Sequence, residues 1–386
     1  MQKTPAIEQP PTIYDVAQAA GVSIASVSRV LNSHGNPRQE TKNRVLRAVA
    51  ELGFVPDGAA RALSARVKEI VGVVFRHVPR ADSHEAADDA ATEEDESLQF
   101  TDLINRGIEV AAQQGGFNLL IGSVDVHGHD ARRQVMTMAR KCDGVILHDR
   151  VLEPEELAQL SRQVPVVTLA GVATDATANV RSDGRSGMGE LARHLIHDHG
   201  YPTVAYLAGH ADSPDNLARR QSLTEETARA GATFVDGPRW QGNYLASGGA
   251  NAVRNLLAEN ATLPRAIACA NDQTALGVMT QLASAGIDVP GEIAVTGFDD
   301  IPVARHLRPQ LTTVRQPIHE LGAAAFDVLR SMITDRGQHG HEPAERDLVL
   351  PTVLVRRQSC GCRAGPVTAA LTDTVTMASA DAEGGT

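Results

Sequence analysis

The sequence predicts an α/β protein in which a small helix-turn-helix unit precedes two doubly wound parallel-sheet subdomains. Three observations support this fold class. Residues 12–32 (TIYDVAQAAGVSIASVSRVLN) contain two short amphipathic helices joined by a turn. From Ile70 onward, apolar strand-like runs alternate with helix-like stretches, which is typical of parallel sheets covered on both faces. The chain has 386 residues, and one hydrophobic core rarely exceeds roughly 250–300 residues, so several folding units are expected.

The helix-turn-helix signal begins at Thr12. Thr12 and Asp15 have the spacing of a capping box, so the first helix is expected to start directly after Thr12. The segment 21–23 (Gly-Val-Ser) supplies a tight turn and a serine cap for the second helix. The apolar positions expected to pack these helices are Val16, Ala17, Ala20, Val27, Val30 and Leu31. A third helix is predicted over 41–52, stopped by Gly53, with an apolar face of Val45, Leu46, Val49 and Leu52.

The second helix carries the residues expected to contact DNA bases. A helix in the major groove turns its N-terminal side chains toward base edges, while neighbouring hydroxyls and amides bond to phosphates. Ile24, Ala25 and Arg29 are the candidates for base contacts, and Arg29 can bond bidentately to guanine O6 and N7. The other candidate DNA contacts are Thr12, Tyr14, Ser23, Ser26, Ser28 and Asn32. The alternatives are a three-helix protein-binding module and, for any single serine, an ordinary exposed position.

Charge is distributed unevenly along the chain. The net charge is −11, but residues 1–68 hold nine Lys and Arg against five Asp and Glu. A positive N-terminal end favours phosphate, and an acidic remainder discourages nonspecific binding. The N-terminus does not resemble a secretory signal and no apolar run is long enough to span a membrane, so a cytoplasmic protein is expected. Four cysteines are too few for a disulfide framework, and Cys142 and Cys269 are expected to be reduced core thiols.

Residues 12 to about 68 resemble the headpiece of the lactose/galactose repressor family of bacterial transcription regulators. The resemblance extends through ELGFVPDGAARALSARVKEIVGVV, where the family has a proline, a short hinge helix and then a first strand. It implies that Leu63 wedges into the minor groove and kinks the operator; the alternative is a buried interdomain contact. Two features depart from the family pattern. NPRQET leaves Gln39 or Thr41 to cap the third helix, and Asp57 and Gly58 weaken the hinge helix off DNA.

From Ile70 to about Cys362 the same resemblance implies a periplasmic-binding-protein-like effector domain. Seven apolar runs are expected to form strands: IVGVVF, FNLLIGS, GVILH, VPVVTLA, TVAYLAG, AIACAND and EIAVTGFDD. Helices are expected over stretches that include 103–115, 131–141, 155–163, 186–199, 247–259 and 273–286.

The expected organisation has five parts: a flexible arm (1–11), the headpiece (12–57), a hinge helix or linker (58–68), the effector-binding domain (69–362) and a disordered tail (363–386). The effector-binding domain would divide into an N-subdomain, about 69–177 and 317–347, and a C-subdomain, about 178–316 and 348–362. The chain would therefore cross between subdomains near Ala178, Gln316 and Leu348.

Ligands of open α/β sheets bind beyond the carboxyl ends of the strands, so the effector is expected there. The resemblance points to Arg220, with Arg219 as its rival because NLARRQSLTEE departs from the family pattern, and to Asn271 and Asp299. Trp240, the only tryptophan, is expected to stack on the apolar face of a sugar. Guanidinium, amide and carboxylate groups can together bond several hydroxyls of a polyol. The alternatives are a surface ion pair for Arg220, a cap or turn for Asn271 and Asp299, and core packing for Trp240.

An acidic insertion follows the first strand of this domain. It holds eight Asp and Glu between Asp82 and Glu96, with no Lys or Arg. Family members make this connection much shorter. The charge run 82–97 predicts a disordered surface loop; the alternatives are a lid beside the cleft and an electrostatic brake on the headpiece.

Other chemistries lack a complete motif. GRSGMG is not a nucleotide fingerprint, and neither a P-loop nor a Gly-x-Ser-x-Gly elbow occurs, so no catalytic residue and no cofactor are predicted. Three histidines, at 194, 197 and 199, lie close in sequence, and Cys360 and Cys362 form a CxC pair. A metal site needs a third or fourth convergent ligand, so none is predicted.

The expected function is a ligand-responsive transcriptional repressor of carbohydrate-utilisation genes. Its expected partners are a palindromic DNA operator, a small sugar-like effector and a second copy of the chain, because two headpieces must meet two half-sites. Effector and DNA binding would be thermodynamically coupled. No leucine heptad follows Cys362, so a tetramer-forming tail is not expected. The alternatives are a sensor of a purine-like or other non-sugar co-repressor and a sugar-metabolism enzyme.

Overall fold

A computed structural model describes residues 11–31, 37–54, 67–77, 87–125, 130–148, 150–259, 261–336 and 346–363. The chain divides into two compact units. The first unit comprises Met1–Asp183, Asp212–Asp215 and Pro317–Pro351, and the second comprises Gly184–Ala211, Asn216–Gln316 and Thr352–Thr386. Three predicted segments lie mostly outside the described residues, namely the arm 1–11, the hinge 58–68 and the tail 363–386. Within the described residues, no helix is both long enough and apolar enough to cross a membrane.

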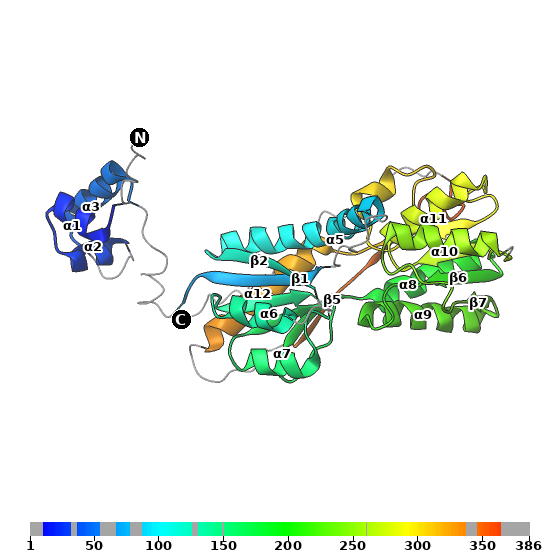
Figure 1. Ribbon diagram of the computed structural model, residues 1–386, viewed down its shortest axis with the longest axis horizontal. Helices are drawn as coiled ribbons and strands as arrows, with labels where there is room; N and C mark the ends of the chain where they lie inside the picture. Colours follow the sequence, from blue (N-terminus) through cyan, green and yellow to red (C-terminus); the bar gives the residue numbers. More distant parts are fainter. Residues whose placement is uncertain are drawn as a thin grey trace, which may run out of the picture. The chain divides into compact units, whose positions relative to one another are not determined.

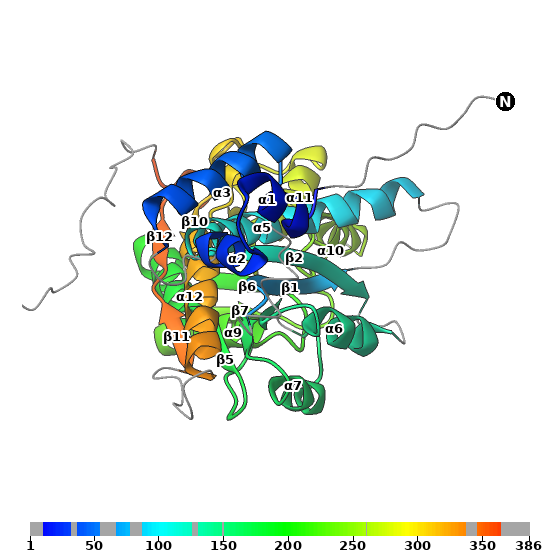
Figure 2. The ribbon, with the colours of Figure 1, turned by 90° about the vertical axis from the view of Figure 1, so that its left-hand side faces the viewer.

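The described part of the headpiece contains three helices, shown in blue in Figure 2. They are α1 (Ile13–Ala20), α2 (Ile24–Leu31) and α3 (Gln39–Leu52). The predicted capping box is present at Thr12. The backbone N–H of Thr12 donates to the Asp15 carboxylate at 2.7 Å, and the Thr12 hydroxyl donates to the same oxygen at 2.7 Å. These bonds hold the pKa of the Asp15 carboxyl below its usual value. Helix α1 then ends at Gly21, whose φ of 60° is the left-handed conformation that glycine adopts without strain.

The three helices enclose a small core of Val16, Ala17, Ala20, Val27, Val30, Val45, Ala48 and Phe54. Two expectations about α3 are wrong. Leu46 and Leu52 are exposed rather than buried, because the face of α3 that meets α1 and α2 runs through Val45, Ala48 and Val49. The helix begins at Gln39, and its N-cap is Arg38, which makes no capping bond through its side chain.

The first unit contains a six-stranded sheet in the order β11-β5-β4-β3-β1-β2, and every pair of neighbours is parallel. The strands are β1 (Ile70–His77), β2 (Asn118–Asp125), β3 (Gly144–His148), β4 (Val166–Leu169), β5 (Ala178–Ser182) and β11 (Asp347–Leu350). Strands β3 and β4 are buried along almost their whole length. This is the pattern of a parallel sheet that is covered on both faces.

Helices cover both faces of this sheet (Figure 1). One face carries α5 (Ala87–Gln114) and α12 (Ile318–Arg336), and the other carries α6 (Ala131–Ala139) and α7 (Pro154–Ser161). Helices α5 and α12 approach closely where glycines face each other. A Cβ on Gly107 would lie 2.1 Å from the carbonyl oxygen of His319, and one on Gly322 would lie 2.2 Å from that of Ile104.

The expected loop at the acidic insertion is wrong for its described part. Helix α5 starts at Ala87, sixteen residues before the predicted start, and takes in the second half of the acidic run. Residues 87–113 contain one glycine and no proline and are rich in alanine and glutamate, which favour helix. Residues 82–86 lie outside the described part of the chain.

The second unit contains a parallel four-stranded sheet in the order β7-β6-β8-β9, together with an antiparallel β10-β12 pair. The strands are β6 (Thr203–Leu207), β7 (Thr233–Val235), β8 (Ala266–Cys269), β9 (Ala294–Thr296), β10 (Thr313–Arg315) and β12 (Val353–Val355). The helices are α8 (Gly184–Arg193), the π-helix η1 (His194–Asp198), α9 (Pro214–Ala230), α10 (Ala246–Ala258), α11 (Asp272–Ser284) and the short 3-10 helix η2 (Pro302–Arg305).

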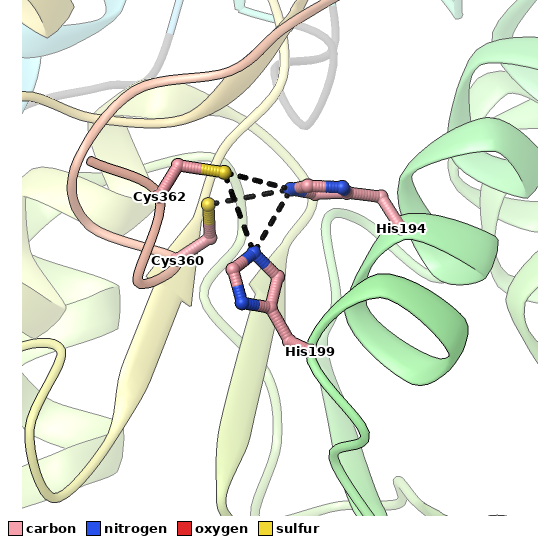
Figure 3. A group of neighbouring side chains, drawn as sticks. All are labelled: His194, His199, Cys360 and Cys362. Carbon is pink, nitrogen blue, oxygen red and sulfur yellow. Dashed lines mark hydrogen bonds between the residues drawn. The ribbon is translucent and has the colours of Figure 1, made fainter. Parts of the chain in front are cut away.

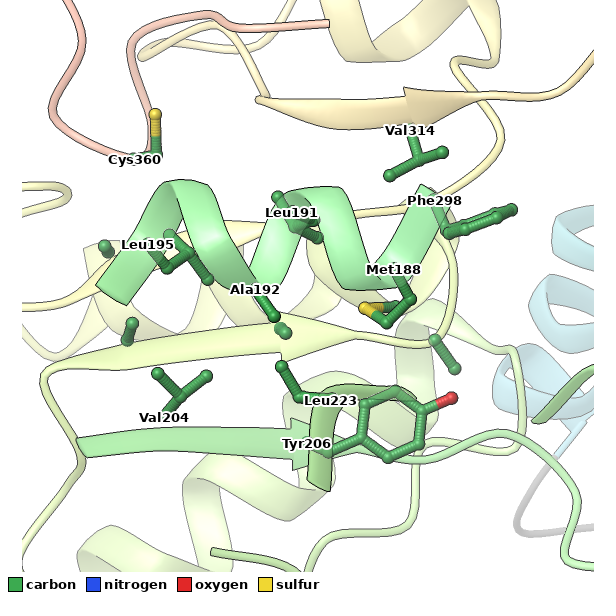
Figure 4. Packing of buried hydrophobic residues seen from close by; sticks show 14 of the residues in the cluster. Met188, Leu191, Ala192, Leu195, Val204, Tyr206, Leu223, Phe298, Val314 and Cys360 are labelled. Carbon is green, nitrogen blue, oxygen red and sulfur yellow. The ribbon is translucent and has the colours of Figure 1, made fainter. Parts of the chain in front are cut away.

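Alternating side chains of β6 pack into two separate hydrophobic cores, one on each face of the sheet. Val204 and Tyr206 join a cluster that includes α8, η1 and Leu223 of α9, and Figure 4 shows this packing. Ala205 and Leu207 join the opposite cluster, with side chains of α10 and α11. Each face of the strand is therefore buried under its own pair of helices, as expected from the two-residue repeat of a strand.

Two crossing points between the subdomains lie a few residues beyond their expected positions. The chain leaves the first unit after Asp183, not near Ala178, and leaves it again after Pro351, not near Leu348. The reason is that β5 and β11 are strands of the six-stranded sheet and pair with each other in parallel. Asp347 of β11 reinforces this pairing, because it accepts hydrogen bonds from the Arg181 guanidinium and from Asn179 of β5.

Candidate functional sites

The exposed surface of α1 and α2 holds most of the candidate DNA contacts. Thr12, Tyr14, Ser23, Ile24, Ala25 and Arg29 are exposed, and Ser26 and Ser28 are half-buried. Tyr14 is 67% exposed and Ile24 is 41% exposed, so both side chains are accessible to a partner. The hydroxyls of Ser23 and Ser26 lie 2.9 Å apart. Asn32 and Leu63 lie outside the described residues.

The turn before α2 is fixed by a residue that the sequence did not single out. Arg44 of α3 donates from Nη2 to the carbonyl oxygens of Ala20 and Gly21, at 2.5 Å and 2.9 Å. These bonds satisfy carbonyls at the C-terminus of α1, where intrahelical partners are missing. Arg44 therefore sets the angle between α1 and α2. The sequence could not distinguish Arg44, because α3 also carries Lys42 and Arg47.

Two of the four candidate effector residues have the alternative roles that the sequence left open. Arg220 is exposed and forms an ion pair with Asp236. Trp240 is 5% exposed and belongs to the apolar core between the sheet, α10 and α11. These contacts leave Arg220 unavailable as the predicted effector ligand and Trp240 unavailable for stacking on a sugar.

Arg219, the rival of Arg220, reaches the carboxyl edge of the second unit's sheet. Its side chain extends from α9 and is buried, and Nη1 donates to the carbonyl oxygen of Ala270 at 2.7 Å. The guanidinium carbon lies 3.7 Å from the centroid of the Phe298 ring. Ala270 directly follows β8 and Phe298 lies just after β9, so Arg219 sits where those strands end.

Asn271 and Asp299 occupy the same edge. The Asn271 carboxamide caps α11 by accepting from the Thr274 N–H at 3.0 Å and donates to the Tyr244 carbonyl oxygen at 3.0 Å. Asp299 accepts from Nε2 of Gln316 at 2.6 Å. The backbone φ of Asp299 is 118°, a value that residues other than glycine rarely adopt, and such strain often marks a functional position.

A further carboxylate lies beneath these residues. Asp272 is fully buried, and its oxygens accept from the Thr313 hydroxyl at 2.5 Å and from the Ile301 N–H at 2.9 Å. Burial, followed by the negative charge of Asp299, raises the pKa of the Asp272 carboxyl well above its ordinary value. Asp272 therefore fixes the loop after β9 from inside the protein.

Asn216, which the sequence did not single out, fixes the start of α9. Its Oδ1 accepts from the Tyr206 hydroxyl at 2.9 Å and from the Gly209 N–H at 2.8 Å. The edge of the sheet thus carries guanidinium, amide and carboxylate groups on a rigid frame. Such a set can bond to several hydroxyls of one small molecule.

A separate cluster of possible metal ligands lies elsewhere in the second unit (Figure 3). His194, His199, Cys360 and Cys362 bring two ring nitrogens and two sulfurs within 4.8 Å of one another. The third and fourth convergent ligands that a metal site requires are therefore present, although the sequence predicted no metal site. His197 is exposed and takes no part.

Comparison with known proteins places these features in one family. Residues 12–57 match the model of bacterial regulatory proteins of the lacI family, and residues 192–360 match that of a periplasmic-binding-protein-like domain. The chain is 32% identical to the HTH-type transcriptional regulator GalR of Escherichia coli K12 over 352 residues, which is 90% of this chain and 95% of that protein.

Solved structures agree with this assignment. The lac repressor dimer bound to operator and the anti-inducer ONPF superimposes with a TM-score of 0.74 at 25% identity, covering 91% of this chain and 99% of that one. The complex of the transcriptional regulator CelR with cellobiose gives 0.61 at 28% identity, covering 90% and 99%. The predicted fold class is confirmed, and the chain belongs to the lacI family of bacterial regulatory proteins.

Proposed function

We propose that this regulator represses carbohydrate-utilisation genes by binding a palindromic operator as a homodimer, and that a sugar-like effector controls its affinity for DNA. The observation that carries the proposal is the pairing of two features in one chain. An exposed α2 follows a rigid turn in the headpiece, and buried polar side chains meet at one sheet edge in the second unit. A relative of the same family is known as a dimer bound to operator.

Base recognition is assigned to exposed residues of α2, with Ile24 and Ala25 at its start and Arg29 in its last turn. Ile24 and Ala25 offer apolar contact to thymine methyl groups, and the Arg29 guanidinium offers two parallel donors to guanine. The hydroxyls of Ser23, Ser26 and Ser28 suit phosphate contacts. Leu63 remains the proposed minor-groove wedge, and Thr12, Tyr14 and Asn32 remain proposed DNA contacts.

The effector is assigned to the carboxyl edge of the β7-β6-β8-β9 sheet. Arg219, Asn271 and Asp299 form the proposed set, in which Arg219 takes the place first given to Arg220 and the stacking role of Trp240 is dropped. Each group is held by the protein before a ligand arrives, which lowers the entropy lost on binding. A sugar is favoured because guanidinium, amide and carboxylate groups can together bond to several hydroxyls, and a relative binds cellobiose.

The relatives are transcriptional regulators rather than enzymes. We propose that this chain likewise has no catalytic role and that it acts in the cytoplasm, because its operator lies on the chromosome.

The experiment uses the purified full-length chain. Symmetric duplexes selected from the region upstream of its own gene are titrated at fixed salt, against scrambled duplexes of the same composition. A panel of mono- and disaccharides is then screened by thermal shift, because a ligand that binds only the native state raises the melting temperature. The proposal predicts preference for a symmetric site and a change in DNA affinity with any sugar that raises the melting temperature. Equal affinity for symmetric and scrambled duplexes would reject it.

A further inference from the structure

The His/Cys cluster is assembled from two segments that are distant in the sequence. His194 begins the π-helix η1 and His199 follows it, while Cys360 and Cys362 flank Gly361 after strand β12. Nε2 of His194 lies 3.2 Å from Nε2 of His199 and 3.4 Å from the sulfur of Cys360. The Cys362 sulfur lies 3.5 Å and 3.4 Å from the same two nitrogens. None of the four cysteines, all in the described part of the chain, is in a disulfide.

These separations match a tetrahedral metal site. Zinc is bound at about 2.0–2.1 Å by histidine nitrogen and at about 2.3 Å by thiolate sulfur. In a tetrahedron with those bond lengths, two nitrogens lie about 3.3 Å apart, and a nitrogen and a sulfur lie about 3.6 Å apart. These four distances agree with the tetrahedral values to within a few tenths of an ångström, and all four ligand atoms lie within 4.8 Å of one another.

The π-helix explains how two histidines five residues apart point to one place. In an α-helix of 3.6 residues per turn, side chains five apart diverge by about 140°. The wider turn of η1 corrects this divergence, and the His199 N–H donates to the carbonyl oxygen of His194 at 3.3 Å. Single π turns of this type occur often at functional sites.

The groups around the cluster orient its nitrogens and sulfurs. Nδ1 of His194 lies 2.7 Å from a carboxylate oxygen of Asp198, which directs the other nitrogen of the ring, Nε2, toward the sulfurs. A carboxylate on the far nitrogen is the usual support of a metal-binding histidine. The His199 ring stacks on Tyr201, whose hydroxyl donates to the Cys360 carbonyl oxygen at 2.7 Å.

Gly361 allows both sulfurs to face the histidines. Its φ is 100°, and a Cβ at this position would lie 2.9 Å from the Tyr201 hydroxyl and 3.4 Å from Nδ1 of His199. Any other residue would push the CxC turn away from the rings. The turn is therefore built to hold the two cysteines against η1.

We propose that Nε2 of His194, Nε2 of His199 and the sulfurs of Cys360 and Cys362 bind one zinc ion. Two thiolate and two imidazole ligands in tetrahedral array favour zinc over the harder Mg²⁺ and Ca²⁺. Both thiols lose their protons to solvent on binding, and neither the metal nor the ligands change oxidation state. All four positions are filled by the protein, which is the pattern of a structural rather than a catalytic site.

The ion would link the segment after β12, through Cys360 and Cys362, to the C-terminal end of the α8–η1 helix, through His194 and His199. Figure 4 shows Cys360 beside Leu195, while Met188 lies at the other end of this helix near Phe298. Phe298 contacts Arg219 of the proposed effector edge. Loss of zinc is therefore expected to lower the stability of the second unit and to leave the headpiece folded.

The first test measures metal in the full-length protein purified without chelators or a histidine tag. Elemental analysis by mass spectrometry should find about one zinc per chain. After removal of zinc with a strong chelator under reducing conditions, titration with Co²⁺ should give the intense visible bands of tetrahedral Co²⁺ and a thiolate charge-transfer band, both saturating at about one equivalent. This test needs no variant. A protein with neither zinc nor a tetrahedral Co²⁺ spectrum would overturn the proposal.

The second test uses Cys362→Ser and His199→Gln, both at partly exposed positions, with His197→Gln as the matched control. The two ligand variants should retain less than about a tenth of the zinc of the parent, and chelator should no longer lower their melting temperature. In the parent and in His197→Gln, chelator should lower it by about 5 °C or more. Full zinc content in both ligand variants, or a Cys360–Cys362 disulfide in the freshly purified parent, would contradict the site.

Discussion

The guanidinium carbon of Arg219 lies 3.7 Å above the ring of Phe298, while Nη1 of the same group donates to the carbonyl oxygen of Ala270. The side chain is thus held flat between the ends of β8 and β9. A cation over an aromatic face is stabilised electrostatically, and more so when it is buried. Arg219 is therefore fixed in position before an effector binds, whereas its neighbour Arg220 forms an exposed ion pair with Asp236.

This difference predicts opposite results for two adjacent substitutions. Arg219→Gln should weaken binding of the sugar identified in the thermal-shift screen by about 10- to 150-fold, because a hydrogen bond to a charged group contributes about 1.5–3 kcal/mol. Arg220→Gln should change it by less than about fivefold, since exposed ion pairs contribute about 0–1 kcal/mol. Isothermal titration calorimetry on both variants checks the prediction. Equal losses would show that Arg219 is not the effector ligand.

The turn of the headpiece allows a matched pair of glycine substitutions. Gly21 and Gly53 have nearly the same φ, 60° and 62°, so alanine at either position bears a similar backbone strain of about 1 kcal/mol. A Cβ on Gly21 would also lie 2.6 Å from Nη2 of Arg44, whereas one on Gly53 would meet nothing within 4 Å.

Gly21→Ala should therefore destabilise the headpiece by about 1–2 kcal/mol more than Gly53→Ala, because Arg44 must give up its bonds to the turn. Denaturant unfolding of the headpiece, followed by the circular dichroism of its helices, measures the difference, and operator affinity should fall in the same order. If both variants lost the same stability, Arg44 would not be what fixes the turn.

The local features of the headpiece were predictable from the sequence, because short-range chemistry specifies them. The capping box of Thr12 and Asp15 and the glycine stop at Gly53 need only neighbouring residues. The parallel strands were predictable for a similar reason, since runs such as GVILH are apolar at nearly every position.

The effector residues were harder to predict because burial in α9 does not follow hydrophobicity. The buried side of this helix includes the polar residues Asn216, Arg219, Ser222 and Glu226. A prediction that places the apolar residues of α9 inside would therefore assign the wrong side of the helix to the core. For this reason the apolar pattern of α9 could not show that Arg219 is buried and Arg220 is exposed.

The His/Cys cluster could not be predicted from spacing. His194 and His199 are five residues apart, which on an α-helix would separate them, and only the π-helix aligns them. The cysteines join them from 166 residues away, through the second unit's tertiary structure.

Arg29 provides a test of base recognition. Arg29→Ala should weaken binding to the selected symmetric duplex by about 5- to 150-fold, since one bidentate contact to guanine contributes about 1–3 kcal/mol. Neither Arg29→Ala nor Arg29→Lys should change binding to scrambled DNA much. Arg29→Lys keeps the positive charge but loses the planar fork, so it should not restore the preference for the symmetric site. Fluorescence anisotropy at one salt concentration measures both. Equal losses on symmetric and scrambled duplexes would assign Arg29 to phosphate contact.

The stability of the first unit should depend on pH through His148. Nε2 of this residue is sealed from solvent and has no hydrogen-bond partner among the described residues, and its ring packs edge-on to Phe75 at 6.2 Å. Burial lowers the pKa of the His148 imidazole from 6.5 to about 4. The unfolded chain therefore takes up this proton as the pH falls below about 6.5, while the folded chain resists it until about 4.

The contribution of His148 to folding is thus present in full above about pH 6.5 and declines as the pH falls toward 4, by at most about 3 kcal/mol. His148→Gln should remove this decline, so the difference in unfolding free energy between parent and variant should shrink steadily between about pH 7 and about pH 5. Urea unfolding at several pH values measures it. Other histidines titrate in both proteins and cancel in the difference. His197→Gln, at an exposed site, should follow the parent, and a difference between parent and His148→Gln that stayed constant with pH would show that the imidazole is not held neutral by burial.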